Sequence, residues 1–200
     1  PHDFVIDGRV ATDENGLPIR YFPERQAELE AAMVAQGIRI HQQIIWKKTR
    51  QVLTYSHFMW QHEPCAYGWT PGSMPVKPPA NEHSVWTIDQ IGEQDGIHPT
   101  QKPVALFKKP MLFHTHPGDI CFEPFSGSGT CIAAAEVTGR RCFAMEISPA
   151  FVDVAIVRWQ NLTGKEATLE GYKTTFSEAK RGRQAQAEDS IKEEIFASEG

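Results

Sequence analysis

The sequence is poor in cysteine, and none of its cysteines lie in a C-x-x-C pair. It has four, which are Cys65, Cys121, Cys131 and Cys142. No spacing matches a known metal site, so metal ligation by His57, His62 and Cys65, or by His114 and His116, is the weaker interpretation. We therefore expect no metal, and we interpret the cysteines as buried, reduced thiols of a cytoplasmic protein.

Long apolar runs are also missing. No run approaches the roughly 20 residues that span a bilayer, and the opening Pro-His-Asp-Phe-Val has no basic segment followed by an apolar one, as a secretory signal would. We expect no membrane partner. An initiator methionine is absent, which favours a fragment or a processed form. The 200 residues, of which 40% are hydrophobic, are enough for one domain with a core.

Acidic residues are absent from two stretches, although the net charge is -5. Residues 31–62 contain no acid, and neither do residues 96–118. A surface formed by these stretches would suit phosphate groups, while ordinary surface lysines are the alternative interpretation. Three basic residues follow a strand predicted at residues 38–46 and are the candidate phosphate contacts: Lys47, Lys48 and Arg50.

Residues 119–146 have the most informative pattern. The sequence predicts a buried strand at 120–122, a turn containing Gly127 and Gly129, a helix at 130–136 that stops at Gly139, and a strand at 142–145 that ends on Glu146. This order is typical of a site for a nucleotide-type cofactor. Glycines allow the ligand to approach the backbone, and an acid after the second strand can accept hydrogen bonds from ribose hydroxyls.

Two related motifs do not fit this turn. A phosphate-binding P-loop needs a lysine after Gly129, and a nucleophile elbow needs one glycine two residues before a central serine and another two residues after it. The turn is an imperfect dinucleotide fingerprint, because Ile132 occupies the position of the third glycine. A purely structural turn is the alternative, but Glu123 at the end of the first strand and Thr130 at the helix start favour a cofactor site.

Other elements are predicted around this stretch. Helices are expected at residues 23–36, 104–113 and 149–161, and strands at 19–22, 65–69, 85–88 and 167–169. Residues 70–96 contain four prolines and are predicted to form a long loop with one short strand. From about residue 173 the charged composition indicates either a solvated helix or a disordered tail.

The motifs together resemble those of the amino DNA methyltransferases. Glu-Pro-Phe-Ser-Gly-Ser-Gly-Thr (residues 123–130) is preceded by His-Pro-Thr-Gln-Lys-Pro (98–103) and followed by Gly-Arg-Arg-Cys-Phe-Ala-Met-Glu (139–146). Ile-Ile-Trp-Lys-Lys (44–48) and Trp-Gln-His-Glu-Pro-Cys (60–65) also resemble motifs of that family. The usual family form begins with Asp, which Glu123 replaces here. The motif order is similar to that of the permuted subgroup, in which the catalytic half precedes the cofactor half.

The resemblance implies an α/β, Rossmann-like S-adenosylmethionine-dependent methyltransferase fold, with a mostly parallel sheet, helices on both faces and an antiparallel strand near one edge. Residues 1–64 would be the remainder of the catalytic half, 65–97 the target-recognition loop region, 98–170 the cofactor-binding half and 171–200 a charged, disordered tail. The implied cofactor-binding residues are Thr100, Gln101, Lys102, Glu123, Pro124, Phe125, Ser126, Gly127, Ser128, Gly129, Thr130 and Glu146.

The implied activity is transfer of a methyl group from S-adenosylmethionine to an exocyclic amino group of double-stranded DNA, with adenine N6 favoured over cytosine N4. Lys47, Lys48 and Arg50 would contact the DNA. A homodimer or a missing N-terminal segment would complete the catalytic half.

One family motif is absent from the sequence. Asp/Asn/Ser-Pro-Pro-Tyr/Phe holds the flipped base, but the adjacent prolines in this chain are Pro78 and Pro79 in Lys-Pro-Pro-Ala. We therefore assign no catalytic residue, and we expect either a truncated enzyme, which the start at Pro1 favours, or a degenerate copy. Two further hypotheses are a non-catalytic remnant that binds cofactor or DNA, and a nicotinamide-dependent oxidoreductase.

Overall fold

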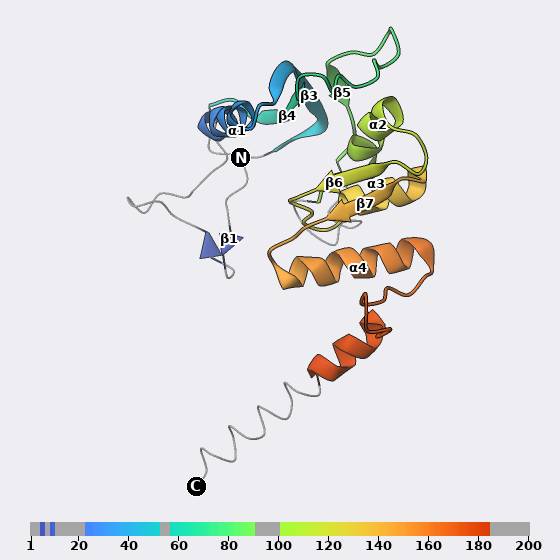
Figure 1. Ribbon diagram of the computed structural model, residues 1–200. Coiled ribbons are helices and arrows are strands. Elements are labelled where there is room, and N and C mark those ends of the chain that lie inside the picture. The colour runs from blue at the N-terminus through green and yellow to red at the C-terminus, as the bar shows by residue number, and fades with distance from the viewer. Residues whose placement is uncertain (1–4, 7–8, 11–22, 53–56, 91–100, 185–200) are drawn as a thin grey trace.

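Figure 1 shows the computed structural model, in which residues 5–6, 9–10, 23–52, 57–90 and 101–184 are described. The strand predicted at residues 19–22 lies outside these ranges, as does Thr100. Near the N-terminus, β1 (Val5–Ile6) and β2 (Arg9–Val10) form a short antiparallel pair.

The first half of the described chain forms a three-stranded sheet. Helix α1 (Pro23–Ala35) leads to Gly37, whose φ of 77° ends the helix, as predicted. Strand β3 (Arg39–Val52) lies between antiparallel β4 (Trp60–Trp69) and parallel β5 (Val85–Thr87). Strand β3 is longer than the predicted strand at 38–46, because it pairs with β4 again beyond Trp46, at Lys47 and at Val52, with an irregularity in the register between those two pairs.

Side-chain alternation along β3 decides which of its residues are covered. Trp46 is only 3% exposed, and its indole N–H donates to the carbonyl of Ile88 at 2.9 Å. Lys48 points to the same side as Trp46, because side chains two apart share a face of a strand. Lys47 points to the opposite, exposed side. The two adjacent lysines therefore have different surroundings.

The second half is a strand–helix–strand unit preceded by a helix. Helix α2 (Val104–His114) comes first, followed by β6 (Ile120–Glu123), α3 (Thr130–Thr138) and β7 (Arg141–Ala144). Strands β6 and β7 pair in parallel, with Cys121 opposite Cys142. These elements lie where the sequence predicted them.

The core of this unit lies between α2, α3 and the two strands. Met111 and three α3 residues, Cys131, Ala134 and Ala135, are buried, and Cys121 and Cys142 pack against them. Small α3 side chains allow the helix to lie close to the strands and to α2. All four cysteines of the chain are free thiols.

Helix α4 (Pro149–Thr163) follows β7 and ends at Gly164, whose φ is 69°. Where a strand was predicted at 167–169, the structure has an isolated antiparallel bridge between Thr168 and Thr175. Residues 176–184 are helical, so the described part of the charged segment adopts the helical alternative. None of the helices in the described ranges combines the length and apolar character needed to cross a membrane.

The strands thus include two parallel pairs, β3–β5 and β6–β7, and β4 is an antiparallel strand at the edge of its sheet. The boundary predicted between residues 64 and 65 falls within β4. Residues 65–69 therefore belong to the sheet, and the long loop begins at Thr70.

Candidate functional site

Two acids lie at the carboxyl ends of the parallel strands β6 and β7. Glu123 is the last residue of β6 and is in register with Ala144 of β7, two residues before Glu146. Between β6 and α3 lies the glycine turn, residues 124–129. This is the edge at which open α/β sheets bind ligands, and Figure 1 shows β6, β7 and α4 meeting around it.

Both carboxylates hold the backbone of the turn. Glu146 accepts hydrogen bonds from the N–H of Gly127 at 2.7 Å and from the N–H of Ser148 at 2.9 Å. Glu123 accepts from the N–H of Phe125 at 2.8 Å. Charge-assisted hydrogen bonds of this kind are stronger than neutral ones, so the acids fix the shape of the turn.

The two glycines of the turn are needed for different reasons. Both have left-handed φ angles, 52° at Gly127 and 76° at Gly129. A Cβ at Gly129 would lie 2.7 Å from the Cβ of Ala155 in α4, so the turn and α4 meet at close range. At Gly127 a Cβ would meet nothing within 4 Å, which leaves open space beside the backbone.

The rest of the turn offers both polar and exposed groups. The Oγ atom of Ser126 is buried and has no hydrogen-bond partner among the described residues. Pro124 and Phe125 are exposed, Phe125 to 85%. Ser128, Gly129 and Thr130 are buried at the start of α3. An unpartnered hydroxyl beside an open glycine fits a ligand that approaches the turn.

Arg158 of α4 was missed by the sequence analysis. Its Nη1 donates to the carbonyl of Ser128 at 3.2 Å and to Oγ1 of Thr130 at 3.0 Å. Burial lowers the pKa of its guanidinium. The spacing of residues in the helix could have identified it. Arg158 lies three residues after Ala155 and therefore on the face of α4 that packs against the turn.

The segment before α2 is joined to the turn and to the first sheet. Oγ1 of Thr130 donates to the carbonyl of Lys102 at 3.2 Å. The Lys102 ammonium contacts Glu63 of β4 at 2.5 Å, and the Lys48 ammonium contacts the same carboxylate at 2.6 Å. Gln101, beside Lys102, is half-buried. Of the predicted cofactor residues before α2, Lys102 is therefore joined through its carbonyl to Thr130, the residue that follows the turn.

Lys48 requires a correction. We predicted that it contacts DNA phosphates, but it is 4% exposed and its charge is paired with Glu63. Burial of Glu63 by itself would raise the pKa of its carboxyl, but Lys102 and Lys48 together outweigh that effect and lower the pKa. Lys48 is therefore a structural counterion. Lys47 and Arg50 are exposed, as a phosphate contact requires.

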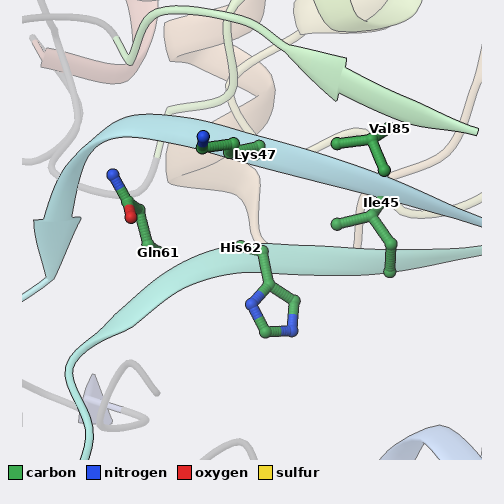
Figure 2. Close-up of a pocket in the computed structure, with 5 residues that line it drawn as sticks. All are labelled: Ile45, Lys47, Gln61, His62 and Val85. Atoms are coloured by element: carbon green, nitrogen blue, oxygen red, sulfur yellow. The ribbon is translucent and has the colours of Figure 1, made fainter.

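A hollow of about 370 Å³ lies against the first sheet, and Figure 2 shows the residues that line it. Ile45 and Lys47 of β3, Gln61 and His62 of β4 and Val85 of β5 line it. Lys47 and His62 are opposite each other in the β3–β4 ladder. The hollow contains one of the predicted phosphate contacts and none of the residues of the glycine turn.

Comparison with known proteins identifies the family. The sequence profile of the N6/N4 DNA methylase family matches residues 14–157. The chain belongs to this family. That assignment favours the methyltransferase interpretation over the oxidoreductase one.

Two curated relatives match a little over two fifths of the chain. The DNA adenine methyltransferase YhdJ of Escherichia coli (strain K12) is 35% identical over 82 residues, which are 41% of this chain and 28% of that protein. The chain thus spans just over a quarter of that relative. The type II methyltransferase M.HinfI of Haemophilus influenzae is 34% identical over 97 residues, 44% of this chain and 27% of that protein.

A solved structure confirms the fold class. The M1.HpyAVI–SAM complex has a TM-score of 0.60 at 23% identity, and the match covers 70% of this chain and 71% of that one. The Rossmann-like α/β fold expected from the sequence is therefore confirmed.

Proposed function

We propose that this chain binds S-adenosylmethionine at the glycine turn. It would be the cofactor-binding part of a DNA methyltransferase that modifies an exocyclic amino group. The observation that carries the proposal is the turn itself. Two carboxylates, Glu123 and Glu146, flank it, Ser126 has a buried hydroxyl without a partner among the described residues, and a Cβ at the adjacent Gly127 would meet nothing within 4 Å. Membership of the N6/N4 DNA methylase family supports it.

Each part of the site would hold a different part of the cofactor. Glu146 would accept the ribose hydroxyls, since it lies after the second strand of a Rossmann-like unit. Residues 123–130 would surround the sugar and the amino-acid part, and Gln101 and Lys102, with Thr100, would contact the carboxylate end. The bound cofactor supplies an activated methyl group on a sulfonium. The residues of the chain bind and orient it.

The proposed nucleic-acid contact is double-stranded DNA, through Lys47 and Arg50. Both are exposed near the end of β3, within a segment of the sequence that contains no acid. Adenine N6 is the favoured target, which the similarity to a protein named DNA adenine methyltransferase supports. The chain spans 28% of that relative, so a homodimer or a further segment would complete the catalytic half.

Isothermal titration calorimetry with S-adenosylmethionine tests the cofactor site. We expect the wild-type chain to bind, and Glu146→Ala to bind about 10- to 100-fold more weakly, the effect of losing hydrogen bonds to a charged group. Glu136→Ala is the matched control. Glu136 lies near the end of α3 away from the glycine turn, and its carboxylate accepts a hydrogen bond from the indole N–H of Trp159 at 3.1 Å. Equal binding by wild type and Glu146→Ala would refute the site assignment.

A methyl-transfer assay tests the reaction. The chain is incubated with double-stranded DNA and S-adenosylmethionine labelled in the methyl group, and the nucleosides are then separated by mass spectrometry. If the chain transfers the methyl group to DNA, N6-methyladenine is the expected product, and N4-methylcytosine would overturn the proposed target. Cofactor binding without label in DNA would favour the non-catalytic alternative, to which the missing Pro-Pro-aromatic motif points.

A further inference from the structure

A single carboxylate joins two lysines from distant parts of the chain. One oxygen of Glu63, in β4, contacts the ammonium of Lys48 in β3 at 2.6 Å. Its other oxygen contacts the ammonium of Lys102, 39 residues later in the sequence. Both ammonium groups lie 5.3 Å from the centre of the Trp46 ring, a distance suited to cation–π attraction. The cluster ties the first sheet to the segment before α2.

Glu63 is essential to this arrangement because of its charge. The Lys48 side chain is only 5% exposed, and that of Glu63 is 26% exposed. A buried ammonium without a partner is strongly destabilising. The two lysines and the one carboxylate together carry a net positive charge.

The cluster continues to the glycine turn through hydrogen bonds. The carbonyl of Lys102 accepts from Oγ1 of Thr130, in the first turn of α3. Arg158 donates to the same Oγ1 and to the carbonyl of Ser128. A displacement of Lys102 would therefore move Pro103, which precedes α2, and would disturb the hydrogen bond to Thr130 at the start of α3.

We propose that Glu63 is a positioning residue of the cofactor site, which acts by holding Lys102 in place and so couples β3 and β4 to the glycine turn. This inference rests on the proposed binding of S-adenosylmethionine. Glu63 does not itself touch the cofactor. Its loss would weaken binding by releasing Lys102, and it would separately destabilise the fold by leaving Lys48 unpaired.

A double-mutant cycle on the full chain, read by calorimetry with S-adenosylmethionine, tests the coupling. Glu63→Gln keeps the size of the side chain and removes its charge, and we expect it to weaken binding about 10- to 100-fold, as expected for one charge-assisted hydrogen bond. Lys102→Met should weaken binding similarly, and the double variant no further, because Glu63 acts through Lys102. Additive losses would overturn the proposal.

Two further variants separate positioning from stability. Glu63→Gln combined with Lys48→Met removes the charge of Glu63 together with the buried charge of Lys48, and it should recover the melting temperature but not the affinity. Recovery of both would show a merely structural role and overturn the proposal. Glu82→Gln is the matched control, because Glu82 pairs with Lys109 at 2.8 Å beside Trp86 without contacting Lys102. It should leave affinity unchanged.

The wild-type titration distinguishes this inference from the proposed function. If the wild-type chain does not bind S-adenosylmethionine, the cofactor site fails, and the positioning role of Glu63 fails with it. If the wild type binds and Glu63→Gln binds equally well, the proposed function stands and only the role of Glu63 is refuted.

Discussion

Replacing Gly129 with alanine tests the close contact between the glycine turn and α4. Gly129 has φ 76° and ψ 29°, a left-handed conformation that costs an L-residue about 1–2 kcal/mol. The new Cβ would also lie 2.7 Å from the Cβ and 3.1 Å from the Cα of Ala155. The Cα belongs to the backbone of α4 and cannot rotate away, so overpacking adds about 1–3 kcal/mol.

We therefore expect Gly129→Ala to lower the free energy of unfolding by about 3 kcal/mol, which for a chain of this size lowers the melting temperature by about 6–12 °C. Differential scanning calorimetry and urea denaturation measure the two quantities. Gly164→Ala is the matched control, since Gly164 has φ 69° and a Cβ there would meet nothing within 4 Å. It should cost about 1 kcal/mol.

A second variant tests the cause of the extra loss. Ala155→Gly removes the Cβ that clashes, so the pair Gly129→Ala and Ala155→Gly should be more stable than the sum of the single effects predicts. The contact with the Cα remains, and rescue should be partial. If Gly129→Ala costs no more than Gly164→Ala, or if Ala155→Gly gives no rescue, the turn does not meet α4 as described.

Three other predictions concern charged side chains. Arg158→Met should lower the free energy of unfolding in urea by about 1–3 kcal/mol, because two oxygens at the start of α3 lose their donor. Lys47→Ala and Arg50→Ala should each weaken DNA binding and reduce the slope of log affinity against log salt by about one, whereas Lys48→Met should lower the melting temperature and leave that slope unchanged. Because the pKa of Glu63 is lower in the folded chain than its ordinary 4.5, its charge stabilises the fold above that pH, and this stabilisation is lost as the pH falls through the folded value. The stability difference between wild type and Glu63→Gln in urea should therefore be full at neutral pH and shrink below 4.5.

The elements around the glycine turn follow from short-range sequence features. Gly139 and Gly164 adopt left-handed angles and end α3 and α4, as their positions in the sequence predicted. Residues 130–136 are mostly small and lie within α3, packed close to the strands. Each of these features depends on neighbours within a few residues, so local propensity and hydrophobic pattern are sufficient to predict them.

Strand β3 shows where local pattern was insufficient. The predicted strand ended at Trp46, because the basic residues that follow look like a solvated loop. In the structure β3 continues to Val52, where Lys47 and Val52 pair with β4 on either side of an irregularity in the register. Strand propensity depends on the partner across the ladder, and the partners of Lys47 and Val52, which are His62 and Trp60 of β4, cannot be recognised from the basic residues alone.

The sequence by itself determined the order of strand, glycine turn, helix and strand, and the two acids that flank the turn, because these lie in one continuous stretch. Only the tertiary structure decided which charges meet. It buried Lys48 next to exposed Lys47, joined Glu63 to Lys102 across 39 residues, and brought Arg158 to the start of α3. The physical reason is that strand pairing and helix packing determine the surroundings of a charged side chain, and both depend on contacts between segments far apart in the sequence.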